Sequence, residues 1–387
     1  MKTKNPQVVS TVQKYTIDGF LLLSFLLVSL GVYYDYLAGG HNWKQGDWLI
    51  NNSAGYVRRG PLGSAFISIS DYIGSNPLLV VSVCQIIILA ILFISFRLLV
   101  TQCNHPKLWL LILISPAIFT VFWVADPLGA VRKELIAFTG LSLYALGSIR
   151  ENWLLLWAGV LVFCISVVSH EAMVLFIPTL FGIIILTELH KTATKHALTS
   201  AIVVTCLSIV AFIYAINTSQ AVETYEICSA LIERGLNELI CRGAIEWLSY
   251  DSSHGFRFVV SMLNTRSIID FLIIYAFALL PFFYIISLGE RKTRNILALV
   301  LLALPFIPLY FVAVDWGRWI SFHIFSASTI LSSAAAKGHF RIQRNPSYFY
   351  IFPLVVLALL ASPNHIIGVI WGGAAKQAEL EFSRFFD

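Results

Sequence analysis

Residues 77–98 read PLLVVSVCQIIILAILFISFRL, an apolar run with a single charged side chain, Arg97, near its end. A helix needs about 20 mostly apolar residues to cross the hydrocarbon core of a bilayer. Similar runs recur along the chain, in which 58% of the 387 residues are hydrophobic, 12% are charged and the mean hydropathy is +0.80. Soluble domains carry about 25% charged residues. The composition therefore predicts an all-α protein that crosses a membrane many times.

The apolar runs predict about eleven transmembrane helices. The first run is too long for the apolar part of a signal peptide and lacks a cleavage site of small residues, so we expect it to be retained. No linker or internal repeat divides the chain, which predicts one membrane domain over 1–387 with one large loop at 218–268. The predicted spans are 17–36, 77–98, 108–124, 127–149, 153–168, 172–189, 197–217, 269–288, 295–314, 319–335 and 348–362.

Lysine and arginine are enriched in short cytoplasmic loops, so their distribution predicts the orientation. With a cytoplasmic N-terminus, that side holds 14 basic and 4 acidic residues, and the other side holds 12 basic and 17 acidic ones. The net charge of +5 is modest and divided among loops, so nucleic acid is not an expected partner. The residues on the N-terminal side are Lys2, Lys4, Lys14, Arg97, Lys107, Arg150, Lys191, Lys195, Arg291, Lys292, Arg294, Lys337, Arg341 and Arg344, with Asp18, Glu151, Glu188 and Glu290.

The loop at 218–268 is the one predicted external segment that contains cysteines, Cys228 and Cys241. An oxidising compartment would permit a disulfide, worth about 3 kcal/mol for a short loop. Two free thiols are the alternative. Apolar residues recur among the charges of this loop at roughly helical intervals, which favours a helical cap on the external face over a catalytic domain. The C-terminal stretch 366–387 is expected to be an interfacial helix.

Four polar clusters lie at the external ends of the predicted spans, and the first contains Arg58 and Arg59 between glycines. Such a turn can present two guanidinium groups to a phosphate or pyrophosphate. We assign Tyr56, in the same turn, to substrate binding. The alternative is that the arginines contact lipid headgroups. The apolar spacing after Pro61 predicts a helix in the membrane interface.

The second cluster runs from Asp126 to Glu134. Asp126 can cap a helix whose first residue is Pro127, which would place Arg132 and Lys133 about 8–10 Å along that helix. Charges inside a span are costly and face a cavity or a partner. The alternative to a functional site is an internal Arg–Glu pair that joins two helices.

The remaining clusters are His170-Glu171 and Asp315 to Arg318. A His–Glu pair can act as a general base and its orienting group, or it can be a satisfied helix turn. The sequence has no metal-ligand spacing, so we expect neither a metal nor a cofactor. Asp315 and Arg318 can pair on one helical face, and Trp316 can stack on a sugar or belong to an interfacial belt. The alternative for Arg318 is an interfacial anchor.

These motifs resemble membrane proteins of bacterial surface-polysaccharide synthesis. The resemblance rests on Asn51 to Gly60, Arg132 to Glu134 and Asp315 to Arg318, and it points to repeat-unit polymerases of the Wzy type and to GT-C-like lipid-dependent glycosyltransferases. The first external loop lacks the paired acidic residues of a typical metal-dependent GT-C enzyme. The resemblance implies a bacterial inner-membrane enzyme that polymerises undecaprenyl-pyrophosphate-linked repeat units of an O-antigen, lipopolysaccharide or capsule type. It also implies contact with membrane lipid and with a chain-length regulator protein.

In this interpretation, arginines replace a metal in stabilising the leaving phosphate. We expect Arg58, Arg59, Arg132 and Arg318 to bind the pyrophosphate, and we assign Lys133 to substrate binding. Glu171 or His170 would deprotonate the acceptor hydroxyl, with Asp126 or Asp315 as the orienting group. Two alternatives stay open: a transferase that adds one sugar from a polyprenyl-phosphate monosaccharide, and a polysaccharide transporter or flippase.

Overall fold

The computed structural model describes residues 11–103, 106–187, 194–218 and 223–386. It is 76% helical with one two-stranded sheet, and five helices are long and apolar enough to cross a membrane. The chain is therefore an all-α membrane-embedded protein. The five are Lys14–Leu37, Pro77–Val100, Lys195–Ala215, Thr265–Leu288 and Lys292–Val312.

The described chain forms eighteen α-helices, five short 3-10 helices and two strands. The α-helices are α1 (Thr11–Leu37), α2 (Gln45–Trp48), α3 (Gly60–Ile73), α4 (Pro77–Val100), α5 (Pro106–Leu113), α6 (Phe119–Ala125), α7 (Glu134–Arg150), α8 (Trp153–Ser169), α9 (Ile177–Thr187), α10 (Thr194–Asn217), α11 (Tyr225–Ile232), α12 (Ser252–Met262), α13 (Thr265–Leu288), α14 (Lys292–Ala303), α15 (Leu309–Val312), α16 (Trp316–Ala336), α17 (Tyr348–Leu360) and α18 (Gly373–Phe386). Short 3-10 helices are η1 (Pro127–Gly129), η2 (Glu171–Phe176), η3 (Glu238–Cys241), η4 (Glu246–Ser249) and η5 (Leu304–Phe306), and the strands are β1 (Ala361–Pro363) and β2 (Val369–Trp371).

Eleven separate spans are not confirmed. The predicted span 108–124 is interrupted, because α5 ends before Ser115 and Pro116 and α6 begins only at Phe119. Proline lacks the backbone N–H that would continue the helix. The span expected at 172–189 likewise begins as the 3-10 helix η2. Its last two residues lie outside the described residues, as do Lys2, Lys4, Glu188 and Lys191, on which part of the predicted orientation rests.

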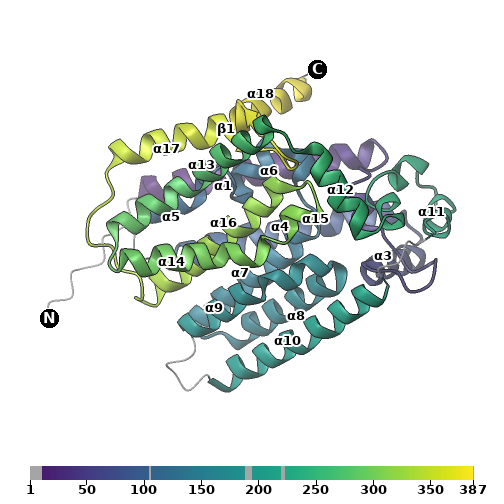
Figure 1. Cartoon of the computed structure of the whole chain (residues 1–387), viewed down its shortest axis with the longest axis horizontal. Coiled ribbons are helices and arrows are strands. Elements are labelled where there is room, and N and C mark those ends of the chain that lie inside the picture. The colour runs from purple at the N-terminus through teal and green to yellow at the C-terminus, as the bar shows by residue number, and fades with distance from the viewer. Residues whose placement is uncertain (1–10, 104–105, 188–193, 219–222, 387) are drawn as a thin grey trace.

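The long helices run side by side along the long axis of the molecule (Figure 1). α7 packs between α4 and α8, α1 packs on α4, and α10 covers α8. The short helices α3 and α11 lie together at one end, at the right of Figure 1. α17 and α18 run along one edge of the bundle, where α18 packs on α6. The polar clusters discussed below lie in the segments that connect these helices and in the first turns of α7 and α16.

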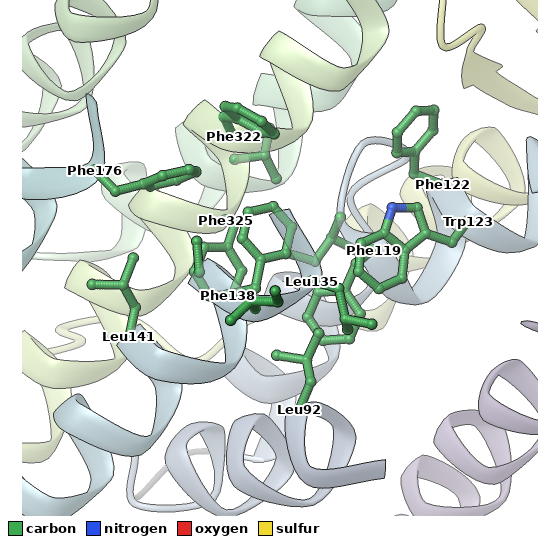
Figure 2. Close-up of a cluster of buried hydrophobic side chains, with 14 of the residues drawn as sticks. Leu92, Phe119, Phe122, Trp123, Leu135, Phe138, Leu141, Phe176, Phe322 and Phe325 are labelled. Carbon is green, nitrogen blue, oxygen red and sulfur yellow. The ribbon is translucent and has the colours of Figure 1, made fainter. Parts of the chain in front are cut away.

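A core of buried aromatic rings joins α6, α7 and α16 (Figure 2). The rings of Phe138 and Phe325 stack with centroids 3.9 Å apart, and Trp123 stacks on Phe138 at 5.9 Å. Phe138 and Phe322 each follow a charged residue, Glu134 or Arg318, by four positions, so ring and charge share one face of their helix. The packed core therefore fixes the faces on which α7 and α16 present these charges.

The large loop forms a cap of short helices over the loop that follows α1. Cys228 and Cys241 form a disulfide within this cap. The side chain of Asn51 donates a hydrogen bond to the carbonyl of Ile227 at 3.5 Å. A Cβ on Gly46 would lie 2.8 Å from the carbonyl oxygen of Ile240, so only glycine permits this approach. The predicted helical cap is therefore present in the described part of the loop, which excludes residues 219–222.

Replacing both Cys228 and Cys241 with serine is expected to lower the free energy of unfolding by about 3 kcal/mol, because the bridge restricts the unfolded chain. Thermal unfolding of the purified protein measures this, and a reductant should lower the melting temperature of the wild type but not of the variant. Cys206→Ser is the matched control, since Cys206 is a free cysteine on α10. Equal melting temperatures for the wild type and the double variant would contradict the prediction.

The C-terminal segment differs from the interfacial helix that the sequence predicts over 366–387. Strands β1 and β2 pair antiparallel, with Ser362 opposite Ile370, and α18 follows them. The connecting turn lies against two glycines of the charged motifs. A Cβ on Gly317 would lie 1.9 Å from the carbonyl oxygen of Asn364, and one on Gly129 would lie 2.6 Å from the Cβ of His365. The hairpin therefore contacts both motifs.

Gly317→Ala is expected to destabilise the protein by about 3 kcal/mol, the upper end of the usual cost of overpacking, because backbone must move to admit the methyl group. The melting temperature reports this loss. Gly19→Ala is the control: Gly19 lies in α1, and no atom lies within 4 Å of the place that an added methyl group would occupy, so the melting temperature should stay or rise. An unchanged melting temperature for Gly317→Ala would show that the hairpin does not press on this glycine.

Candidate functional site

The backbone that carries Arg59 is held in a left-handed conformation, with φ of 66°. Non-glycine residues rarely adopt positive φ, so the surrounding contacts must hold this turn. α3 begins directly afterwards at Gly60, and a Cβ on Gly63 would lie 2.0 Å from the carbonyl oxygen of Ile50. The glycines of this motif thus serve close packing of α3 on its own loop, as well as the turn at Gly55, where φ is 90°.

The second cluster does not lie along a helix that begins at Pro127, contrary to the prediction. Asp126 caps only η1, accepting a hydrogen bond from the backbone N–H of Gly129 at 3.3 Å. Val131 then adopts a φ of 48°, a rare conformation for a β-branched residue, and α7 begins at Glu134. Arg132 and Lys133 therefore precede α7 instead of lying inside it.

Two buried hydrogen bonds hold the strained turn at Val131. Its carbonyl oxygen accepts from the indole Nε1 of Trp48 at 3.1 Å and from the side-chain amide of Gln85 at 3.0 Å. Backbone strain persists where surrounding structure determines it, and such residues cluster at functional sites. After this turn, Arg132, Lys133 and Glu134 contact three different residues, which are Asp315, Asp47 and Arg318 respectively.

Arg318 forms a buried ion pair with Glu134. Its Nε donates to Oε1 of Glu134 at 3.0 Å and its Nη2 donates to Oε2 at 2.7 Å, a two-point contact between α16 and α7. Its Nη1 donates to Oδ1 of Asp315 at 3.0 Å. Both Arg318 and Glu134 are buried. The expected pairing of Asp315 with Arg318 is present, and so is the Arg–Glu pair that joins two helices.

Asp315 also links Arg318 to Arg132. The Nη1 of Arg132 donates to Oδ1 of Asp315 at 3.1 Å, so one carboxylate oxygen accepts from two guanidinium groups. The Nε of Arg132 is buried and has no hydrogen-bond partner among the described residues. A buried donor without a partner costs free energy, and an anion at this position would supply the missing acceptor.

Lys133 is fully buried between Asp47 and Arg59. Its Nζ lies 3.7 Å from Oδ1 of Asp47 and donates to the carbonyl oxygen of Arg59 at 3.3 Å. Burial lowers the pKa of Lys133 to about 8, although the charge of Asp47 opposes this shift. Burial alone would raise the pKa of Asp47. The positive charges around it, of which Lys133 has the largest effect, instead hold the pKa of Asp47 below its usual range. Asp47 is therefore an anion at neutral pH.

Arg59 connects this pair to the third cluster. Its Nε donates to Oε2 of Glu171 at 2.8 Å and its Nη2 donates to the other carboxylate oxygen. The Nδ1 of His170 accepts from the backbone N–H of Ala172 at 3.1 Å. The neutral imidazole then carries its proton on Nε2, which makes it a donor at that atom. In this arrangement both carboxylate oxygens of Glu171 accept from Arg59, which makes the carboxylate a weaker base.

Three other residues predicted to bind substrate, Arg58, Tyr56 and Trp316, differ in how far they are buried and in what they contact. Arg58 is half-buried and forms no ion pair or side-chain hydrogen bond within the described part of the chain. Tyr56 is 84% exposed. Trp316 is buried against Phe271, with ring centroids 4.7 Å apart, and its indole donates to the carbonyl of Tyr310. Trp316 therefore offers no free face to a sugar, which argues against that role.

Asp126 contacts the C-terminal hairpin. Its Oδ2 accepts from the Nδ1 of His365 at 2.8 Å and from the backbone N–H of the same residue. The sequence contained no signal for this contact, because the two residues are far apart in the chain. Asp47 and Glu134 were also not among the catalytic or substrate-binding residues predicted from the sequence. For Asp47 the available signal was an acidic residue in the first external loop, 11 positions before the double arginine motif at Arg58.

The four polar clusters thus form one centre, to which Asp47 is added. It brings together Arg58, Arg59, Arg132, Lys133, Arg318, Asp47, Glu134, Glu171 and Asp315. The arginines are held by carboxylates, while Arg58, the Nε of Arg132 and the Oδ1 of Asp47 keep hydrogen-bonding capacity. Within the described ranges, no three His, Cys, Asp or Glu side chains are placed to hold a metal ion. Such a centre can bind an anion and accept a proton beside it.

No protein-family model, curated protein or solved structure matches the chain.

Proposed function

We propose that the protein is a membrane glycosyltransferase that polymerises repeat units linked to undecaprenyl pyrophosphate at the external face of a bacterial inner membrane. The observation that carries this proposal is that five cationic side chains lie in one charged centre, two from the loop before α3, two from the loop before α7 and Arg318 from the first turn of α16. Buried guanidinium groups, already oriented by carboxylates, stabilise charge that develops on a phosphate without further rearrangement.

In the proposed reaction, an acceptor hydroxyl attacks the anomeric carbon of the donor glycan. The new glycosidic bond forms as the bond from that carbon to the lipid pyrophosphate breaks, and the pyrophosphate leaves with the bonding electrons. Arg58 and the Nε of Arg132 have donors without a side-chain partner among the described residues, and in the proposal these donate to its oxygens. Arg59, Lys133 and Arg318 supply further positive charge around it.

The general base that the geometry favours is Asp47. Its Oδ1 is buried, lies beside Lys133 and accepts no hydrogen bond from the described residues, so a substrate hydroxyl can donate to it. Glu171 and His170, the bases expected from the sequence, are engaged with Arg59 and with the backbone of Ala172. In the proposal these two residues position Arg59, and Asp315 positions Arg132 and Arg318.

Deletion of the gene in its bacterial host tests the proposal through the length of the surface glycan. Loss of a polymerase leaves single repeat units on the lipid carrier or its final acceptor. Full-length chains that lack one sugar would instead indicate a transferase that uses a polyprenyl-phosphate monosaccharide. Accumulation of lipid-linked repeat units on the cytoplasmic side would indicate a flippase and overturn the proposal. Re-expression of the wild-type protein, compared with Asp47→Asn, is the matched control.

A further inference from the structure

A group of aromatic rings lies between the cap and the loop that follows α1. The ring of Trp247 lies 5.8 Å from Trp43 and 5.3 Å from Phe258. Tyr250 and His254 stack on one another with centroids 4.2 Å apart and an interplanar angle of 13°, and both also contact Trp247. All five residues, here called the aromatic platform, are half-buried, so each keeps part of its surface accessible.

The platform adjoins the charged centre through Trp43. The guanidinium of Arg132 lies 5.5 Å from the Trp43 ring, within the range of a cation–π contact. The backbone N–H of Ala244 donates to the carbonyl of Asn42, and a Cβ on Gly243 would lie 3.1 Å from Asn42. The cap is thus docked directly on the segment that contains Trp43. A ligand whose reacting end lies at Arg132 can continue across the platform.

The platform faces away from the apolar surface of α12 that suits lipid. His254 and Phe258 are four positions apart and so share one side of α12, where they contact Trp247. Phe256 and Val260 lie on another side of the same helix and are about half exposed. An interfacial helix would turn this second side toward the membrane. In that orientation the aromatic platform faces the aqueous side, where it can bind a water-soluble ligand.

The rim of the platform is polar. Glu246 is exposed beside Trp247, and Asp251 and Ser253 are exposed between Tyr250 and His254. Partly exposed aromatic residues beside polar groups match the two surfaces of a pyranose. Its C–H face packs on the electron-rich ring face, and its hydroxyls bond to the polar rim.

We propose that the aromatic platform binds the growing glycan chain, a pyranose oligosaccharide, and so holds it with one end at the charged centre. This inference rests on the proposed function and adds a binding subsite to it. The ligand class follows from the half-buried rings, their polar rim and their continuity with Arg132.

Isothermal titration calorimetry on the full-length protein in detergent tests the platform. The probe is a lipid-free oligosaccharide released by mild acid from the surface polysaccharide of the host. We expect saturable binding to the wild type and at least about fivefold weaker binding for Trp247→Leu, which keeps apolar volume but loses the ring face. Tyr250→Leu serves as the second variant if Trp247→Leu does not fold. Trp153→Leu is the matched control, since Trp153 is 59% exposed at the opposite end of α8 from His170.

Elongation of lipid-linked repeat units, measured on the same preparations, separates this inference from the proposed function. Wild-type elongation with unchanged oligosaccharide affinity in both platform variants would overturn the platform and leave the polymerase in place. Oligosaccharide binding that depends on Trp247, without any elongation by the wild type, would support the platform and overturn the polymerase. Absence of binding to the wild type, or variants that lose retention in membranes but keep oligosaccharide affinity, would also overturn the platform.

Discussion

Arg318→Ala is expected to destabilise the protein by about 3–5 kcal/mol and to abolish glycan elongation. The substitution leaves Glu134 as a buried carboxylate without its two guanidinium hydrogen bonds, and removal of one partner of a buried ion pair has a cost of this size. The loss of elongation is expected because, in the proposed reaction, the same guanidinium supplies positive charge to the leaving pyrophosphate. Denaturation of the purified protein and the length of the surface glycan measure the two effects separately.

The double variant Arg318→Met with Glu134→Leu distinguishes a structural role from a functional one. It replaces the ion pair with apolar side chains, which is often neutral for stability, and Asp315 keeps its hydrogen bond from Arg132. We expect its stability to return to within about 2 kcal/mol of the wild type, while elongation stays absent. Normal chain length in this stable variant would show that Arg318 only joins α16 to α7.

Asp47→Asn is expected to lower the rate of elongation by about 10²–10⁴-fold, the usual contribution of a general base. The amide keeps the shape of the carboxylate but cannot take the proton of the acceptor hydroxyl. The loss of stability should be small. Without the Asp47 charge, the pKa of Lys133 falls below its value of about 8, so the buried amine can lose its proton instead of remaining an unpaired charge. Initial rates of elongation at neutral pH and the melting temperature measure the two effects.

Asp71→Asn is the matched control for this substitution. Asp71 accepts two hydrogen bonds from Arg234 on the cap, and this exposed ion pair lies outside the charged centre. We expect this control to elongate glycan at the wild-type rate. A full rate for Asp47→Asn, together with a large loss for Glu171→Gln, would return the role of the base to Glu171.

The sequence predicted the helical class and the positions of most helices because apolar length alone determines them. Helix α4, for example, covers Pro77–Val100 where the apolar run predicted 77–98. It did not predict the interruptions, since the left-handed turn at Val131 is held by Trp48 and Gln85 from other segments. A single window of sequence contains no information about such partners.

The candidate site, like the fold, was predicted only in part from the sequence. Arg59, Arg132 and Arg318, which belong to three separate clusters in the sequence, lie in one charged centre, but their partners were not evident from local spacing. Asp315 and Arg318, three positions apart, are the exception, because helical geometry alone brings them together. Glu134 and Arg318 are 184 positions apart and meet only when α7 and α16 pack.

By itself, the sequence determined that the chain is a helical membrane protein and that costly charged residues cluster in a few loops. Both follow from composition and from periodicity within short segments. The tertiary structure decided which charges face one another, which hydrogen-bonding atoms remain free and that the C-terminal hairpin contacts Asp126. These outcomes depend on how packed aromatic side chains orient α7 and α16, and this orientation arises only from contacts between segments distant in the chain.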